Sequence, residues 1–524
     1  MAAKNFYDAV LVGLDLSTLL AGALLSKRGF RVLVLGQGVP WPTYRVRDVR
    51  FPRAPFAFTA PDSPAVARVF SELALRPLMQ RRTRPLTPAF QAVLPGHRVD
   101  FGRDAELLGR ELDREFPGSR RFVEELWEGA RESHAKLDGL LERDLMWPPE
   151  RFFERREFSR AALGTPLGVP ASVSSKWAAR ASLQPPLPDS APERTEVHRE
   201  FESGSPLSRI LAACIRDTAA SAREVEFSPR TLRLLQGLCG AAELDEGGLS
   251  GLFELLIDSI HTHNGSLRLT ERVDALTVKR QSLSSLHLFP SDEEIGCHYL
   301  LWGLSVARLG ALLPERNELQ PLFDQVGEPR AIFSRFTLNL LVRADAIPEG
   351  MARRILLLGD DPMWIESERT SDGQRAVLTI EAKLPVREGE DRSELLATQR
   401  ERMLKSLSLL SPFLRPHIEL IDSPHDGRPV EDVRQGSVFM PDDGGRRGPD
   451  TMEAVYAFPR PRLQGTAALN VRTPIERLLL CNTQVVPGLG LEGVFLTAAS
   501  AARAVTRSLN RDWMNRGRWT KVEL

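Results

Sequence analysis

Residues 7–36 contain the pattern that most restricts how this chain folds. Two continuous apolar runs, Tyr7 to Val12 and Arg31 to Leu35, flank a helical stretch from about Ser17 to Arg28. Gly29 follows that stretch in the position of a helix C-terminal cap. Uninterrupted apolar strands are typical of a parallel sheet covered on both faces. A strand, a helix and a second parallel strand therefore predict an α/β fold.

The apolar stretch from Ala9 to Leu25 also has some features of a secretory signal, because Lys4 precedes it. Asp15, Ser17 and Thr18 interrupt it, however, and its first half favours a strand whereas its second half favours a helix. We therefore interpret it as part of the folded domain and expect a cytoplasmic protein without a transmembrane segment.

Composition excludes several classes of function. Hydrophobic residues make up 42% and charged residues 26% of the 524 residues, values that are ordinary for a globular protein of more than one domain. The 69 basic and 69 acidic residues cancel, so nothing global indicates nucleic acid or an anionic membrane as the partner, although local patches remain possible. The four cysteines are far apart and form no C-x-x-C motif, which predicts buried free thiols in a reducing compartment.

Helical and strand patterns alternate along the rest of the chain. Apolar residues at three-and-four spacing predict helices over 65–75, 104–116, 120–143, 208–218, 250–262, 391–410 and 494–509. Alternating patterns predict antiparallel strands at 336–342, 353–359 and 376–384. The polar, proline-rich segment 185–206 predicts a loop between helices. A second domain built on an antiparallel sheet with packed helices follows from these patterns.

Three segments in this order resemble the phytoene desaturase branch of the FAD-dependent amine oxidase superfamily: YDAVLVGLDLSTLLAGALLSKRGFRVLVL at 7–35, GGLSGLFELL at 247–256 and LLLCNTQVVPGLGLEGVFLTAASAARAV at 478–505. The resemblance implies a Rossmann-like, FAD/NAD(P)-binding-type parallel-sheet domain and a second α+β substrate domain on an antiparallel sheet. We expect the first domain to comprise 1–58, 225–310 and 465–524, and the second to comprise 59–224 and 311–464.

The residues that would bind FAD in such a family are largely replaced. The dinucleotide fingerprint requires G-x-G-x-x-G and an acidic residue about twenty positions further on. Here these positions hold Gly13, Asp15, Thr18 and Gly36, so only the first glycine remains. Gly36 offers no acceptor to a ribose, and Gln37 would replace it only weakly.

Asp15 is the most disruptive of these departures. A carboxylate about 4 Å from a diphosphate charge costs about 4 kcal/mol at an effective dielectric near 20, or about three decades of affinity. The same side chain suits a different role, as the N-cap of the helix that begins at Leu16 or Ser17. An N-cap would satisfy amides that a cofactor otherwise satisfies.

The C-terminal turn gives a mixed signal. Asn482 and Thr483 stand where the resembling family carries a glycine followed by a small or acidic residue. Gly488, Gly490 and Gly493 of PGLGLEG are retained, and their backbone amides would suit an anion-accepting nest or only a sharp strand-to-helix turn.

These departures favour a non-catalytic pseudo-oxidoreductase that has lost FAD and binds a protein partner or a hydrophobic, isoprenoid-like ligand through its second domain. Rab GDP-dissociation inhibitors provide the analogy, since they resemble the same scaffold without working as flavin enzymes. The alternative is an FAD-dependent oxidoreductase of the phytoene desaturase or amine oxidase type acting on a hydrophobic substrate. In such enzymes the flavin does the chemistry and the protein mainly positions the substrate, so the sequence identifies no catalytic side chain. A third possibility is that Gly13 and PGLGLEG bind a different nucleotide.

Other constellations favour simple structural roles. His261 and His263 are two residues apart on a helix end, do not share a face and lack a third ligand, so we predict no metal site. The arginine clusters at 81–84 and 151–156 are typical of solvated faces, and a binding surface is the alternative.

Overall fold

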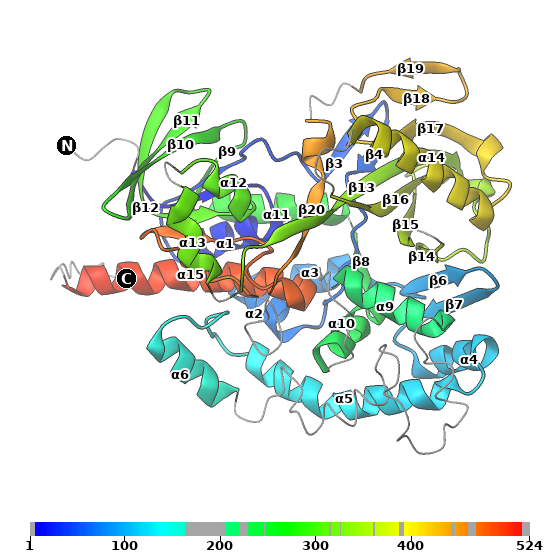
Figure 1. Ribbon diagram of the computed structural model, residues 1–524, viewed down its shortest axis with the longest axis horizontal. Coiled ribbons are helices and arrows are strands. Elements are labelled where there is room, and N and C mark those ends of the chain that lie inside the picture. Colours follow the sequence, from blue (N-terminus) through cyan, green and yellow to red (C-terminus); the bar gives the residue numbers. More distant parts are fainter. Residues whose placement is uncertain are drawn as a thin grey trace.

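The computed structural model describes residues 6–162, 205–218, 229–245, 247–313, 316–324, 326–359, 362–386, 392–441, 446–459 and 468–515. Two large sheets lie side by side in this structure, and a layer of helices runs beneath them (Figure 1). The segment 185–206, which we predicted to be a loop, lies almost entirely outside the described residues.

The first sheet has seven strands, in the order β10-β11-β12-β1-β2-β9, with β21 paired to β12. The pairs β1–β12, β1–β2, β2–β9 and β12–β21 are parallel, whereas β10, β11 and β12 form antiparallel pairs. Its strands are β1 (Phe6–Val12), β2 (Val32–Leu35), β9 (Ser266–Arg268), β10 (Arg272–Lys279), β11 (Ser282–Phe289), β12 (Glu293–Trp302) and β21 (Leu478–Leu480).

Helix α1 (Leu16–Lys27) is the centre of this half of the molecule. It packs against α11 (Gly248–Thr262), α15 (Gly490–Asn515) and β2. Every residue from Leu16 to Ser26 is buried, which explains why α1 is apolar around its whole circumference rather than along one stripe. The continuous apolar runs of β1 and β2 arise in the same way, because helices and neighbouring strands cover both faces.

The second sheet has ten strands, in the order β19-β18-β17-β13-β16-β15-β14-β6-β7, with β20 paired to β13. All its pairs are antiparallel except β14–β6. Its strands are β6 (Phe90–Leu94), β7 (His97–Phe101), β13 (Arg330–Arg343), β14 (Arg354–Leu358), β15 (Pro362–Arg369), β16 (Arg375–Pro385), β17 (Ile418–Asp422), β18 (Val430–Asp432), β19 (Ser437–Phe439) and β20 (Glu453–Ala457).

Helix α14 (Arg392–Leu410) covers one face of the second sheet. Alternate residues of β13, namely Phe336, Leu338, Leu340 and Val342, share an apolar core with Met403 and other residues of α14. Leu341 faces the other way and packs with the short hairpin of β3 (Thr43–Val46) and β4 (Val49–Pro52). This alternation is the period-2 pattern expected of a sheet covered on both faces.

The remaining elements complete the helical layer and the connections. The helices are α2 (Pro64–Glu72), α3 (Arg76–Arg82), α4 (Ala105–Glu115), α5 (Ser119–Leu141), α6 (Phe152–Ala161), α9 (Pro206–Thr218), α10 (Pro229–Cys239), α12 (Val306–Gly310) and α13 (Gln320–Phe323). The short 3-10 helices are η1 (Arg316–Leu319), η2 (Ala344–Ala346), η3 (Arg415–His417), η4 (Pro449–Thr451) and η5 (Pro487–Leu489), and β5 (Thr83–Pro85) pairs with β8 (Ala242–Leu244).

The mixed α/β architecture, with parallel and antiparallel sheets, confirms the coarse fold prediction. The prediction omitted β11 and β12, although β12 lies directly beside β1. The first half of β12 carries Glu293 and Glu294 and pairs antiparallel with β11, so it lacks the continuous apolar run by which β1 and β2 were found. No helix in the described ranges combines the length and the apolar composition needed to cross a bilayer.

Candidate functional site

The predicted site residues meet where the parallel strands end and two helices begin. Gly13 follows β1 and its amide donates to Leu35 O (2.9 Å), while the amide of Gly303, directly after β12, donates to Val12 O (2.8 Å). The hydroxyl of Ser17, in the first turn of α1, donates to Cys481 O (2.7 Å) beyond the end of β21. The structure therefore brings the first and last predicted segments to one edge of the sheet, where α1 and α15 have their N-termini.

Asp15 is the N-cap of α1. Its Oδ1 accepts a hydrogen bond from the Thr18 amide (2.6 Å) and another from the Ser17 hydroxyl (3.0 Å). Although part of the side chain reaches solvent, burial raises the pKa of Asp15 to about 6, against the opposing effect of the hydrogen bonds from Thr18 and Ser17. The carboxylate therefore occupies the helix N-terminus in the capping role that the sequence indicated.

Thr18 faces Gly303 across the gap between α1 and β12. A Cβ atom on Gly303 would lie 2.1 Å from Thr18 Oγ1 and 2.8 Å from Val12 O, so only glycine fits there. Thr18 is fully buried, and its hydroxyl has no hydrogen-bond partner among the described residues. Its side chain thus fills the helix-to-strand contact that a glycine at position 18 would leave open.

Gly36 lies against the main chain that follows β9. A Cβ atom at this position would come within 2.1 Å of Leu269 O and 2.8 Å of Leu269 C. The neighbouring Gln37 fixes the same segment, since its side-chain amide donates to Val273 O (2.8 Å) and its Oε1 accepts from the Val273 amide (2.7 Å). Position 36 therefore has no space for the acidic side chain of the fingerprint, and Gln37 is engaged with the protein itself.

Asn482 and Gln484 stabilise the turn after β21 from within. Asn482 is buried, and its side-chain amide donates to Leu304 O while its Oδ1 accepts from the Gln484 amide (3.0 Å). Gln484 in turn accepts from the Val306 amide (2.8 Å). Thr483 points to solvent. These amide side chains connect the turn to the segment after β12, which is the same edge that Gly13 and Thr18 approach.

The glycine-rich turn begins α15 earlier than the sequence predicted, at Gly490 rather than Val494. Gly490 has a φ of 53°, a left-handed conformation that favours glycine. A Cβ atom on Gly493 would lie 2.1 Å from Val486 O, so this glycine permits a close backbone approach. Gly488 is buried in the 3-10 turn η5. Two of the three glycines are thus required by the turn itself.

Glu492, in the first turn of α15, forms a buried ion pair that sequence reasoning missed. Arg233 of α10 binds it with two hydrogen bonds (Nη2 to Oε1, 2.7 Å; Nε to Oε2, 3.0 Å), and Asp138 of α5 contacts the same guanidinium at 2.6 Å. Burial alone would lower the pKa of Arg233, but the hydrogen bonds and charges of Glu492 and Asp138 outweigh it and raise that pKa. The only signal in the sequence is an acidic residue in a helix first turn, which is too common to identify the pair.

The surroundings of the cysteine thiols and of His263 indicate structural rather than catalytic or metal-binding roles. All four cysteines are buried, and burial raises the pKa values of Cys239 and Cys297 to about 12, which makes these thiols poor nucleophiles. His263 Nδ1 lies 2.7 Å from Ser259 O at the end of α11. Nowhere in the described ranges do three or more metal-ligating side chains come together.

Comparison with known proteins gives the class of fold. No family model matches the sequence, and no curated protein matches it. The structure is similar to an oxidoreductase from Methanosarcina mazei (TM-score 0.55, 13% identity, 94% of this chain and 99% of that chain). It is also similar to cyclohexylamine oxidase from Brevibacterium oxydans (TM-score 0.51, 15% identity, 96% of this chain and 100% of that chain). Putrescine oxidase bound to putrescine is a third similar structure (TM-score 0.53, 11% identity, 97% of this chain and 99% of that chain).

This chain therefore shares its overall fold with these three solved structures over nearly its whole length. At these identities the likeness concerns the fold alone, because one fold supports many activities. The predicted resemblance is confirmed for the fold that the chain shares with amine oxidases; the phytoene desaturase branch and the Rab GDP-dissociation-inhibitor analogy stay predictions.

Proposed function

We propose that this protein is a non-catalytic binding protein on an oxidoreductase scaffold that does not hold FAD. The observation that carries the proposal is the contact between Gly36 and Leu269, where a Cβ atom would lie 2.1 Å from a carbonyl oxygen. An acidic side chain that accepts a ribose hydrogen bond cannot be placed there without moving the main chain. The ribose side of a dinucleotide site is thus closed by the protein's own backbone.

On the pyrophosphate side, the obstacle to FAD is an unfavourable charge rather than a lack of space. Asp15 Oδ1 already accepts the Thr18 amide that a helix N-terminus would offer to a phosphate. With a pKa of about 6, the carboxylate is mostly ionised at neutral pH. It would therefore repel a diphosphate and compete with it for the same donors.

The second part of the proposal concerns what the protein binds. We assign binding of a protein partner or a hydrophobic, isoprenoid-like ligand to the part of the chain outside the first sheet, by analogy with Rab GDP-dissociation inhibitors. The analogy supports only the general idea that this scaffold can serve as a binding protein once flavin chemistry is gone. The discontinuous two-domain division proposed from the sequence belongs to the same hypothesis.

The alternative is an FAD-dependent oxidoreductase acting on a hydrophobic substrate. One observation favours it: the likeness to cyclohexylamine oxidase and putrescine oxidase extends over 96% and 97% of this chain. In such an enzyme FAD would accept the hydride, and the residues of this chain would serve to position the substrate.

Absorption spectra separate the two. The purified protein is incubated with excess FAD, freed of unbound FAD by gel filtration and scanned in the visible range. We expect no flavin band in the wild type. Asp15→Gly/Thr18→Gly, which restores the three glycines, should gain weak binding at most because Leu269 still closes the ribose side. A stoichiometric flavin band in the wild type would contradict the proposal and favour the oxidoreductase.

A further inference from the structure

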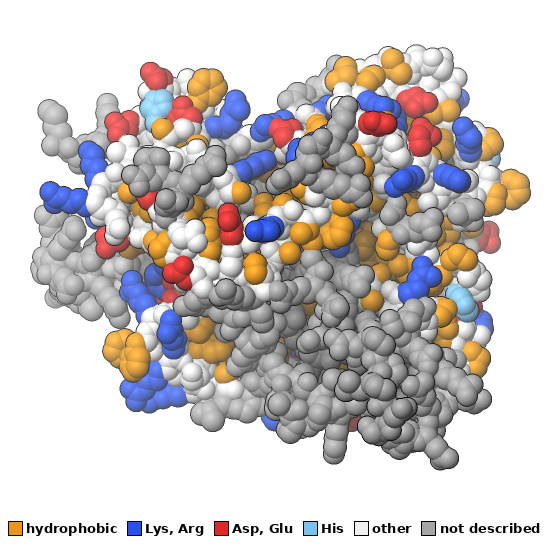
Figure 2. Space-filling view, viewed as in Figure 1, with side chains coloured by type: hydrophobic (Ala, Val, Ile, Leu, Met, Phe, Trp, Pro, Cys, Tyr) orange, Lys and Arg blue, Asp and Glu red, His pale blue; other side chains and the backbone are white. Residues whose placement is uncertain are grey.

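Helix α6 carries an exposed aromatic pair in a strongly basic setting. Phe152 and Phe153, at its start, are each 72% exposed, and their rings meet edge to face at 5.6 Å. Figure 2 shows hydrophobic side chains with Lys or Arg side chains around them over α6, at the lower left of that view. Two adjacent aromatic rings in water lose the free energy that burial would provide, which makes the patch a candidate for an interaction surface.

The opposite face of α6 is firmly attached to the protein. Glu154 is buried and forms an ion pair with Arg472 (2.8 Å). Phe158, one turn later, is buried edge to face against Trp147 with ring centroids 5.0 Å apart. Glu154 and Phe158, four residues apart on the inner face, therefore hold α6 in place, and Phe152 and Phe153 are exposed on a helix of fixed position.

The arginines around the pair have no acidic partners among the described residues. Five exposed arginines belong to this patch, and none of them forms an ion pair within the part of the chain that the structure describes: Arg143, Arg151, Arg155, Arg156 and Arg160. The two carboxylates nearby are already neutralised, since Arg503 binds both Asp144 (2.6 Å) and Glu157 (3.1 Å). Because the whole chain has no net charge, this positive charge is a local property of the patch.

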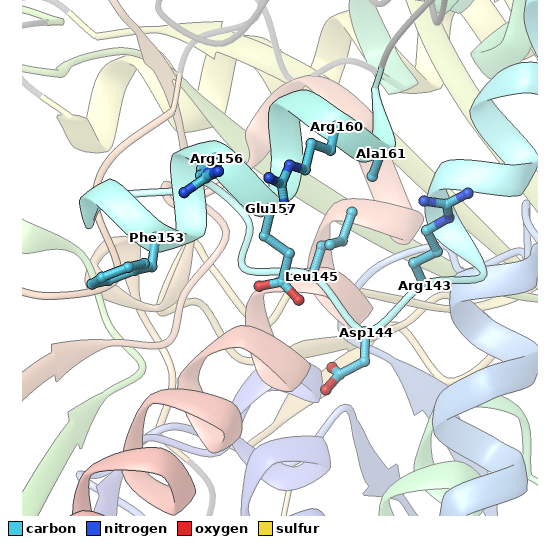
Figure 3. Close-up of a pocket in the computed structure, with 8 residues that line it drawn as sticks. All are labelled: Arg143, Asp144, Leu145, Phe153, Arg156, Glu157, Arg160 and Ala161. Carbon is cyan, nitrogen blue, oxygen red and sulfur yellow. The ribbon is translucent and has the colours of Figure 1, made fainter.

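A groove of about 500 Å³ lies between α6 and the turn that follows α5. Figure 3 shows Arg160 of α6 and Arg143 of the turn on opposite sides of it, with Leu145 between them. Phe153 and Arg156 line its end towards the start of α6. The two carboxylates that Arg503 binds line the groove as well. The groove thus combines arginines, paired carboxylates and an apolar contribution, and it is of a size that accepts a small-molecule group.

We infer that α6 and this groove form a docking surface for an anionic lipid bilayer. The two Phe rings enter the interfacial region, the exposed arginines bind headgroup phosphates, and the groove accepts a headgroup. Exposed aromatic side chains enter the boundary between headgroups and acyl chains, and basic residues near an anionic leaflet are each attracted to it. The interfacial region of a bilayer can accommodate two protruding rings without a preformed pocket, whereas an acidic protein surface would need a pocket for them.

Vesicle co-sedimentation tests this inference on the full chain. Vesicles of phosphatidylcholine alone are compared with vesicles that also contain phosphatidylglycerol, at low and high salt. We expect at least about tenfold tighter binding to the anionic vesicles, weakened by salt because the contacts are electrostatic. Phe152→Ser/Phe153→Ser should weaken that binding about tenfold or more, and Arg155→Gln/Arg156→Gln about fivefold per arginine.

Matched controls carry the same chemical changes elsewhere on the surface. Phe413→Ser alters a residue that is 81% exposed beyond the end of α14, and Arg110→Gln/Arg369→Gln removes two exposed charges from α4 and β15. These variants should bind anionic vesicles within about twofold of the wild type, a difference too small for loss of a contact. Thermal unfolding of every variant confirms that it is folded.

Three outcomes would overturn the inference. The first is a wild type that does not bind anionic vesicles even at low salt. The second is a loss of binding in the arginine variant but not in the phenylalanine variant, which would show that the patch attracts anions without inserting its rings into the bilayer. The third is displacement from vesicles by inorganic phosphate at constant ionic strength, which would identify a small-anion site instead.

Discussion

The N-termini of α1 and α15 meet the same edge of the first sheet, yet they use their carboxylates differently. At α1 the carboxylate is local: Asp15 caps the Thr18 amide three residues on, partly in contact with solvent. At α15 the carboxylate is buried: Glu492 binds Arg233, which is 259 residues away in the chain. Both helix ends therefore carry internal negative charge where a cofactor anion would be favoured. Loss of a local cap lowers the free energy of unfolding only slightly, whereas removal of one partner from a buried long-range ion pair lowers it strongly.

The largest effect should come from breaking the long-range pair. Arg233→Met leaves Glu492 buried without its cation, and we expect a loss of about 3–5 kcal/mol in the free energy of unfolding. Urea unfolding followed by circular dichroism measures this loss. Asp138 remains more exposed and should contribute little to the loss.

The double variant Arg233→Met/Glu492→Gln is the control for that measurement. Removing the buried charge together with its partner should restore most of the lost stability, because the cost lies in the uncompensated carboxylate. If the double variant is as unstable as Arg233→Met, the pair stabilises the helix by packing rather than by charge, and the contrast with α1 fails.

The next effect concerns the contact between Gly36 and the main chain after β9. Gly36→Ala places a methyl group 2.1 Å from Leu269 O, so the main chain must shift, and we expect a loss of about 2–3 kcal/mol. Gly139→Ala, in the last turn of α5 with no atom within 4 Å of the new Cβ, should instead gain up to about 1 kcal/mol from helix propensity. Unchanged stability in Gly36→Ala would show that the segment after β9 moves easily and that the ribose side can open.

A smaller effect depends on pH and isolates Asp15. Its folded-state pKa of about 6 is above the ordinary value of 3.8, so folding favours the neutral form. The corresponding stability is fully present below about pH 4 and is lost as pH rises through about 6. Allowing for partial solvent contact, we expect the wild type to lose about 1–2 kcal/mol over this range relative to Asp15→Asn, which keeps the cap. The test is denaturant unfolding of both proteins at several pH values between about 4 and 7. Parallel curves of unfolding free energy against pH would contradict the prediction.

The same contrast explains what the sequence could predict. The strand, helix and strand at 7–36 are local features: β1, α1 and β2 begin and end within a few residues of their predicted bounds. Asp15 was recognised as an N-cap because capping is decided within one helical turn. The turn glycines were recognised for a similar reason, since a sharp turn leaves a local signature.

The long-range contacts left no such signature. The close approach of Leu269 to Gly36 cannot be inferred from sequence spacing, because the two residues are 233 positions apart. The sequence therefore showed that the acidic acceptor is missing, but not that a main-chain carbonyl occupies its place. The Arg233–Glu492 pair joins elements whose proximity depends on the whole fold. The prediction that these positions are vestigial, and the proposed domain boundaries, stay predictions.

The smallest effect concerns a buried hydroxyl in the first turn of α1. The Thr18 hydroxyl is buried and has no hydrogen-bond partner among the described residues. Thr18→Val replaces it with a methyl group of similar size, and we expect a gain of about 0.5–1 kcal/mol because an unsatisfied buried hydroxyl is removed. Thr506→Val is the matched control in α15: its hydroxyl donates to Ala502 O (2.9 Å) and accepts from Arg28 Nη1 (3.2 Å), so that variant should lose at least a similar amount. If Thr18→Val loses stability instead, the hydroxyl is hydrogen-bonded in solution, and the close contact between Thr18 and Gly303 admits a partner for it.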